Sequence, residues 1–402
     1  MNKKKIFNDP VYGFVTIPHD ILFDLVEHRY FQRLRRIKQV SLTHYVYPGA
    51  LHTRFHHALG ALHLMGQSIE VLRSKGVEIS EEEAIAASVA ILLHDIGHGP
   101  FSHTLEHTLV NVNHEEISLL FMERLNEEFK GQLSLAIDIF KNKYHKKFLH
   151  QLISGQLDMD RMDYLNRDSF FTGVHEGVIG YDRIIKMLAV HDGKLVVEEK
   201  GIYSIEKFLI ARRLMYWQVY LHKTVLVAEQ MLVKTLERAK ELAVSDAHFN
   251  VPESLSFFLY KDYTLNDFRK NSDLLDHFAR LDDYDIMGAL KSFMYHHDPV
   301  LSYLATCLID RHLFKIKMQD KPFTKKDISV IRQRVGERNI LPKENLDYLV
   351  FIGEETNHAY STSKDEIKIL FKNGKVLPMS QISDFGIQTK LVKKHYLCFP
   401  KG

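Results

Sequence analysis

The feature that most limits what this chain can fold into is an apolar run of ten residues, Ala84 to Leu93. The preceding Ser80-Glu81-Glu82-Glu83 has the spacing of a capping box, which predicts a helix start. Because the run is apolar on nearly every face, the helix must be buried among other elements. It leads into His94-Asp95-Ile96-Gly97-His98, where the glycine favours a helix end. The sequence therefore predicts a central helix that delivers an imidazole and a carboxylate to one point.

Most of the remaining chain also has helical periodicity. We expect helices over residues 57–72, 115–129, 148–167, 204–242, 272–280, 285–295 and 300–308. We expect a β-hairpin from residues 194–197 and 201–203, and strands over 367–371 and 394–399. The predicted fold is mainly α: a helical bundle with a small β-hairpin and a smaller α+β C-terminal lobe. The expected division is an N-terminal arm (1–45), a helical core (46–245) and the C-terminal lobe (246–402).

Composition excludes several classes of protein. The 402 residues are 45% hydrophobic and 26% charged, which is typical of a globular chain with a sizeable core. Two cysteines exclude a disulfide framework and a cysteine-based zinc site. The sequence has no apolar run of 18 residues, so we expect no membrane span and a cytoplasmic protein. The net charge of +2 does not favour nucleic acid, and the basic cluster Arg33 to Lys38 would ordinarily be a solvated surface.

Histidine is unusually frequent and unevenly placed. Ten of the 24 histidines fall between His44 and His114, which core packing alone does not explain. His94 and Asp95 offer two metal ligands, and His57 and Asp160, on neighbouring predicted helices, are candidates for two more. Each alone has an ordinary alternative, a packed core histidine or a surface aspartate. Together they predict one divalent metal, which such ligands leave open among Mn, Fe, Mg, Ni and Zn.

Six sequence blocks in order resemble the HD-domain deoxynucleoside triphosphate triphosphohydrolases, which include bacterial dGTPase-like enzymes and the animal SAM-and-HD-domain enzyme. The blocks are residues 6–13, 31–35, 47–50, 54–57, 94–103 and 160–164. The resemblance runs from about Lys5 to about Lys315, so we expect no SAM domain before it. It implies an HD-domain fold for the helical core and assigns His57, His94, Asp95 and Asp160 to the metal.

That family converts a dNTP and water into a deoxynucleoside and triphosphate, which requires a metal to activate water, cations for the phosphates and an acid for the leaving oxygen. The resemblance makes His114 the general acid, Glu106 its carboxylate partner in place of the usual Asp, and His98 a further catalytic residue. The residues implied for substrate binding are Gln39, Val40, Arg54, His98, His103, Arg161, Tyr164, Asp168, Arg212 and Tyr220. Arg161 stands where the family usually has Lys. Tyr164 against the sugar would discriminate against a 2′-hydroxyl.

The resemblance also implies a regulatory site for a guanine nucleotide, GTP or dGTP, at the interface of a homo-oligomer, suspected to be a tetramer. The residues implied are Lys5, Asn8, Asp9, Glu27, Gln32, Arg35, Arg183, Lys200, Arg311 and Lys315. Glu27 replaces the usual Asp. In an adjoining second site, Glu198 and Ser204 stand where Arg and Asn are expected, so a second nucleotide fits less well. The ordinary alternative is that the basic N-terminal residues only bridge subunits.

The leading interpretation is therefore a metal-dependent dNTP triphosphohydrolase that prefers dGTP and is activated by nucleotide. One alternative is an HD phosphohydrolase acting on another nucleotide phosphoester. Those enzymes lack the sugar and phosphate set of Arg54 and Tyr164 to Asp168. The other alternative, from a different class, is a nucleotide sensor or single-stranded nucleic-acid-binding protein, which would not need a water-activating centre.

Overall fold

The predicted apolar helix is α4, Glu81–Leu93, and it begins and ends where the sequence indicates. The Ser80 hydroxyl accepts a hydrogen bond from the Glu83 amide (3.1 Å), and the Glu83 carboxylate accepts one from the Ser80 amide (2.8 Å). Residues 86–93 of α4 are buried along its whole circumference. The prediction of a buried helix is confirmed for all of α4 beyond its exposed first residues, Glu81 and Glu82, and the partly buried Ile85.

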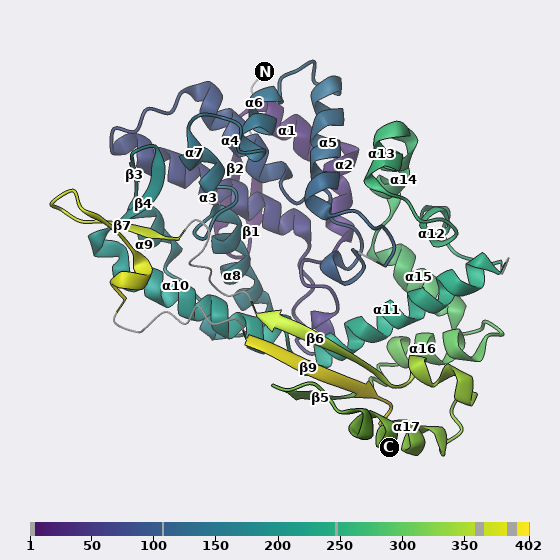
Figure 1. Cartoon of the computed structure of the whole chain (residues 1–402). Helices are drawn as coiled ribbons and strands as arrows, with labels where there is room; N and C mark the ends of the chain where they lie inside the picture. The colour runs from purple at the N-terminus through teal and green to yellow at the C-terminus, as the bar shows by residue number, and fades with distance from the viewer. Residues whose placement is uncertain (1–4, 107, 246–247, 358–365, 384–391, 402) are drawn as a thin grey trace.

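The computed structural model describes residues 5–106, 108–245, 248–357, 366–383 and 392–401, with the exception of the His103 side chain (Figure 1). The helices of the first half are α1 Asp20–Glu27, α2 Arg29–Gln32, α3 Arg54–Ser74, α4 Glu81–Leu93, α5 His114–Glu128, α6 Ser134–Phe140, α7 Lys147–Gln151, α8 Met159–Thr172 and α9 Tyr181–Lys186. The helices of the second half are α10 Ile202–Met215, α11 Lys223–Val244, α12 Glu253–Leu259, α13 Leu265–Lys270, α14 Ser272–Arg280, α15 Asp283–Phe293, α16 Pro299–Ile309 and α17 Lys325–Gly336. In these described parts, no helix is both long enough and apolar enough to span a bilayer.

The described strands form three small sheets of two, four and three strands beside many helices, so the predicted mainly α class is confirmed. The strands are β1 Lys5–Asp9, β2 Gly13–Ile17, β3 Leu188–His191, β4 Lys194–Glu198, β5 Lys315–Gln319, β6 Phe351–Asn357, β7 Lys368–Leu370, β8 Val376–Pro378 and β9 Val392–Phe399. β1 pairs with β2, and β9 lies between β5 and β6, antiparallel to both. β7 pairs parallel to β4, so the C-terminal part of the chain extends the hairpin of the helical core.

The predicted hairpin is present, but its strand pairing was predicted wrongly. β4 pairs with β3, which precedes it, and residues 201–203 are the end of a 3-10 turn and the start of α10 instead of a strand. The turn is Asp192-Gly193, in which both residues have positive φ (49° and 70°). An Asp-Gly pair with this backbone is the preferred two-residue hairpin turn. The sequence thus contains a hairpin turn signal directly before residues 194–197, whereas the predicted turn lay directly after them.

The single long helix predicted over 204–242 is two helices. α10 ends at Met215, and residues Tyr216–Tyr220 form a π-helical turn before α11 begins at Lys223. The His222 imidazole caps α11 by accepting from the Thr224 amide (3.1 Å). No Gly or Pro marks this break, and apolar residues recur on both sides of it, so periodicity alone merged the two helices.

Only part of the basic cluster Arg33 to Lys38 is the solvated surface that it would ordinarily be, because Arg35 and Arg36 are exposed but Arg33 is buried and Lys38 partly buried. Arg33 is fully buried and donates to the carbonyls of Ile96 (2.9 Å) and Leu281 (3.3 Å). The buried Asp283 carboxylate accepts from the amides of Lys38 (2.9 Å) and Phe101 (2.8 Å). These contacts tie the loop after α4 to the start of α15, because otherwise its backbone groups would be buried without partners.

Candidate metal centre and active site

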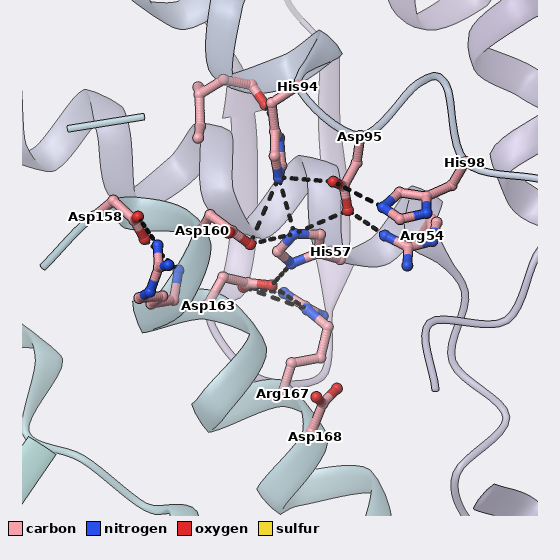
Figure 2. Close-up of polar contacts among 12 residues, drawn as sticks. Arg54, His57, His94, Asp95, His98, Asp158, Asp160, Asp163, Arg167 and Asp168 are labelled. Atoms are coloured by element: carbon pink, nitrogen blue, oxygen red, sulfur yellow. Dashed lines mark hydrogen bonds and ion pairs between the residues drawn. The ribbon is translucent and has the colours of Figure 1, made fainter. Parts of the chain in front are cut away.

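Four side chains from three helices converge at the C-terminal end of α4, as Figure 2 shows. The Asp160 carboxylate lies 3.1 Å from His57 Nε2 and 3.5 Å from His94 Nε2. The Asp95 carboxylate lies 3.7 Å from His57 Nε2 and 3.4 Å from His94 Nε2. The structure thus brings together all four residues that the sequence assigned to a metal.

The donor set fits a divalent ion. The two Nε2 atoms face each other at 3.4 Å, and each ring carries a partner at its other nitrogen: the Ile91 carbonyl at His94 Nδ1 (2.6 Å) and the Asp163 carboxylate at His57 Nδ1 (2.7 Å). Because those acceptors require protons on Nδ1, each Nε2 atom presents a lone pair to the same point once its ring is neutral. With ligand bonds of about 2.0 to 2.2 Å, neighbouring donors around an ion lie roughly 2.8 to 3.6 Å apart, close to the separations observed.

The charges at this point also favour a cation. Burial alone would lower the pKa of His57, but hydrogen bonds to Asp160 and Asp163 outweigh it and raise that pKa to about 10. Burial raises the pKa of Asp160, yet the hydrogen bonds from His57 and His94 hold it well below its usual range. Carboxylates that remain ionised at a buried site need positive charge beside them. A divalent ion held by His57, His94, Asp95 and Asp160 would supply that charge.

A second group lies on the other side of Asp95. His98 Nε2 lies 3.4 Å from the Asp95 carboxylate, and the Arg54 guanidinium donates to the same carboxylate. The His98 ring stacks on His114 at a centroid distance of 3.9 Å. Glu106 accepts from both Nδ1 (2.9 Å) and the amide (2.8 Å) of His114, which fixes that ring at the start of α5. Burial, and then the charge of Arg54, lower the pKa of His98 well below its usual value, so its ring is neutral.

These residues open onto a cleft of about 520 Å³, within the range of small-molecule sites. Ten residues of the predicted site line the cleft: Gln39, Val40, Arg54, Asp95, His98, His114, Asp160, Tyr164, Asp168 and Tyr220. The Asp168 carboxylate accepts from Tyr220 (2.7 Å) and lies 2.7 Å from His52 Nε2. Arg161 pairs with Asp158 and Arg212 donates to Gln156 (3.2 Å), so neither lines the cleft. The predicted role of His103 lies outside the described side chains.

The residues predicted for an activator do not form one site within a single chain. Lys5 pairs with Glu27 (3.0 Å), and Arg35 donates to Gln32 (2.9 Å). Asn8 lies in β1, and Lys315 begins β5. Arg311 donates to the Tyr45 carbonyl (2.9 Å), and Arg183 to the Lys200 carbonyl (3.1 Å). Asp9 is buried and pairs with Arg167 (2.7 Å).

The sequence reasoning missed the residues that support the metal ligands. Asp163 accepts a hydrogen bond from His57 and also pairs with Arg167 (2.9 Å), as Figure 2 shows. Arg167 in turn pairs with Asp9, and all three residues are buried. A Cβ at Gly60 would lie 2.0 Å from the Asp163 carboxylate, so glycine is required where α3 meets α8. The available signal was the spacing: Asp160, Asp163 and Arg167 are three and four residues apart, which places them on one face of a helix.

Comparison with known proteins agrees with this geometry. Residues 54–168 match the model of the HD domain, and residues 179–251 match that of the HD associated region. A crystal structure of a phosphohydrolase from Bacteroides thetaiotaomicron is 51% identical, with a TM-score of 0.95, and the match covers 99% of this chain and 100% of the other. The chain belongs to the HD-domain phosphohydrolases. Its membership agrees with the family resemblance of the six sequence blocks.

The curated relatives include an uncharacterized bacterial protein and dNTP triphosphohydrolases. An uncharacterized protein of Bacillus subtilis, YwfO, is 32% identical over 322 residues, which are 78% of this chain and 72% of the relative. The human deoxynucleoside triphosphate triphosphohydrolase SAMHD1 is 27% identical over 282 residues, 59% of this chain. The match covers only 45% of the human protein. The relatives thus include dNTP triphosphohydrolases, matched over about half of their own length.

Proposed function

We propose that this HD-domain phosphohydrolase is a metal-dependent dNTP triphosphohydrolase, which converts a dNTP and water into a deoxynucleoside and triphosphate. One observation carries the proposal. A single cleft contains two carboxylates of the metal set (Asp95 and Asp160), a buried arginine (Arg54), a histidine pair (His98 and His114) and an aromatic wall with a carboxylate. A hydrolase that cuts at the α-phosphorus of a nucleotide needs each of these groups in reach of one bond.

The residues around Asp95 supply the polar chemistry. A divalent metal bound there would lower the pKa of water and add positive charge near the phosphates. Arg54 is held by Asp95 and by the Ser102 hydroxyl (2.9 Å), which presents its planar group to phosphate oxygens. The neutral His98 can donate one hydrogen bond to the phosphate that is attacked. His114, oriented by Glu106, is the proposed acid for the leaving 5′-oxygen.

The opposite wall suits a deoxyribose. Tyr164 and Tyr220 lie edge to face, with ring centroids 6.1 Å apart, and Asp168 is fixed between Tyr220 and His52. An oriented carboxylate can accept from a 3′-hydroxyl, while a rigid tyrosine leaves no room for a 2′-hydroxyl. We propose that this wall selects deoxynucleotides. To bind a phosphate group of the substrate, Arg161 would have to give up its ion pair with Asp158.

We further propose that a guanine nucleotide binds between subunits and activates a homo-oligomer. The support is that Lys5, Glu27, Gln32 and Arg35 lie on the N-terminal elements, whereas Arg311 and Arg183 lie elsewhere in the chain. A symmetric interface between two subunits could bring these separate groups together. Glu198, which would oppose a second nucleotide, pairs with Lys75 (2.7 Å), so its charge is partly neutralised. A cytoplasmic location stays a prediction.

The test incubates the protein with each dNTP and Mn²⁺ or Mg²⁺, with and without GTP, and resolves the products. Release of inorganic triphosphate with free deoxynucleoside is expected. Release of pyrophosphate or orthophosphate would instead favour another nucleotide phosphoester as substrate, and tight RNA binding without turnover would favour the nucleic-acid alternative. Size measurement by light scattering with and without GTP tests the oligomer.

A single substitution, Asp95→Ala, tests the proposed metal centre. Asp95→Ala removes a carboxylate that contacts both metal histidines, so we expect loss of metal and a loss of turnover of at least about 10³-fold, typical when a metal-activated nucleophile is lost. Asp347→Ala, at an exposed pair with Arg332, is the control. Circular dichroism checks that both variants are folded. Full activity of the Asp95 variant would exclude the proposed centre.

A further inference from the structure

One carboxyl group in the cleft has no role in the chemistry described above. Glu229 lies on α11, where Leu226, Glu229 and Gln230 are three and four residues apart and all line the cleft. Glu355 of β6 is a second carboxyl group in the same lining. This wall is built from α11 and the C-terminal sheet, on elements separate from the α3, α4 and α8 residues that hold the metal set.

The environment of Glu229 is unusual for a carboxylate that only stabilises a fold. Its partners are the hydroxyls of Ser41 and Thr104, which are themselves 3.0 Å apart. In the described parts of the chain, no Lys, Arg or His forms an ion pair with it. Loss of hydration raises the pKa of Glu229 to about 7, and the nearby Glu355 adds to that rise. A carboxyl group in such a place gains stability when a ligand donates hydrogen bonds to it.

The backbone beside Glu229 is also strained. Ser41, Phe101 and Ser102 have φ values of 47°, 53° and 52°, in the left-handed region that side chains other than glycine rarely adopt. All three line the cleft. Backbone strain of this kind concentrates at ligand sites. The positive φ values at Ser41, Phe101 and Ser102 therefore support a ligand-binding role for this part of the cleft.

The other residues of the cleft indicate which part of a bound nucleotide would contact Glu229. Arg54 and the metal set attract phosphate, and a carboxylate facing the triphosphate would be repelled. Tyr164, Tyr220 and Asp168 form the proposed sugar wall. Glu229 contacts Ser41, which directly follows Gln39 and Val40 in the chain. The uncharged end of the nucleotide, its base, is the part that remains for Glu229.

We propose that Glu229 is the base-reading residue of this cleft and that it selects a purine with two adjacent N–H donors, as guanine has at N1 and N2. This inference rests on the proposed dNTP hydrolysis and names the residue that sets its base preference. A carboxylate has two oxygens and accepts such a donor pair in a bidentate manner. Adenine, cytosine and thymine each place an acceptor next to the donor on that edge, which would face a carboxylate oxygen unfavourably.

The experiment measures kcat/KM for dGTP, dATP, dCTP, dTTP and dITP with Mn²⁺ on the full chain and on Glu229→Gln. dITP lacks only the N2 amino group of guanine. We expect the wild type to prefer dGTP over dITP, and Glu229→Gln to lower kcat/KM for dGTP roughly 10-fold or more, as for loss of a bidentate base contact, while changing dTTP about 2-fold or less. The penalty of the substitution should be smaller with dITP than with dGTP.

Glu237→Gln on the same helix is the matched control, because Glu237 pairs with Lys234 (2.7 Å) and does not line the cleft. It should leave all five values unchanged. An equal fall for every dNTP in Glu229→Gln would make Glu229 a residue that only supports Ser41 and Thr104, and unchanged values would remove it from substrate binding. Both results overturn the inference but not the proposed function. Absence of dNTP hydrolysis by the wild type would overturn both.

Discussion

Asp163→Asn tests whether the buried chain Asp163–Arg167–Asp9 tunes the metal centre through His57. Asp163 accepts from His57 Nδ1 (2.7 Å) and pairs with Arg167 through both oxygens (2.9 Å each). Asparagine keeps the volume and one acceptor but removes the negative charge that makes His57 a stronger ligand. Asp163 touches none of the cleft, so its effect reaches the metal only through His57.

The expected magnitude follows from that role. Loss of a carboxylate behind a ligating histidine typically lowers metal affinity 10- to 100-fold, which corresponds to about 1.4 to 2.7 kcal/mol. At a fixed excess of metal, the metal-dependent gain in stability should fall by the same amount, because that gain follows the logarithm of ligand concentration over Kd. A separate loss of stability, present without metal, is expected because Arg167 keeps only Asp9 as its partner.

The assay is calorimetric titration of the chelator-treated protein with Mn²⁺, together with thermal unfolding at several metal concentrations. Asp9→Asn is the matched control, since it removes the other carboxylate of Arg167 (2.7 Å) and does not contact His57. Both variants should lower the Tm of the metal-free protein, but only Asp163→Asn should weaken Mn²⁺ binding. Equal weakening by both variants, or wild-type affinity in Asp163→Asn, would refute this explanation.

Two further predictions concern the frame of the site. A Cβ at Gly97 would lie 2.2 Å from the Ser118 amide and 2.3 Å from the His114 carbonyl. Gly97→Ala should therefore separate the loop from α5 and lower Tm by several degrees. Gly66→Ala is the control, because a Cβ at Gly66 meets no atom within 4 Å and should leave Tm unchanged. Burial raises the pKa of Glu83, but contacts with Lys146, Tyr144 and Ser80 outweigh it and lower that pKa. Because a lowered carboxyl pKa gives stability that is present at neutral pH and lost in acid, Glu83→Gln should lower Tm at pH 7 and lose this effect toward pH 3. An equal effect at both pH values would contradict the ionic origin.

The parts of this molecule that short-range patterns specify were predicted well. The capping box at Ser80 and the glycine after His94 bound α4 correctly, and α14 lies over residues 272–280 as expected. Periodicity failed where no Gly or Pro separates two consecutive helices, at the π-helical turn Tyr216–Tyr220. It could not foresee the burial of Arg33, because that depends on carbonyls of Ile96 and Leu281, which only the tertiary structure brings to it.

The residues of the candidate site also differ in whether a local sequence pattern predicts them. His57, His94, Asp95 and Asp160 were predicted as metal ligands from their combination, because each alone has an ordinary alternative, and the structure brings all four side chains together. Glu229 carries no motif and lies on a helix whose sequence reads as an ordinary amphipathic surface. Its partners Ser41 and Thr104 are more than 120 residues away in sequence. No local pattern can report a contact of that range.

The anchoring of the loop after α4 has a consequence for biosynthesis. Phe101 donates to Asp283, a residue 182 positions later, and Arg33 donates to Leu281, 248 positions later. While the chain emerges from the ribosome, the metal residues are complete once Asp160 has been made, but the acceptors that fix their loop are still missing. Because a domain generally folds as one unit, we expect the helices that carry these four residues to reach their final packing only when the start of α15 is available. Catalytic competence would thus arrive late in translation, after the start of α15 has left the exit tunnel.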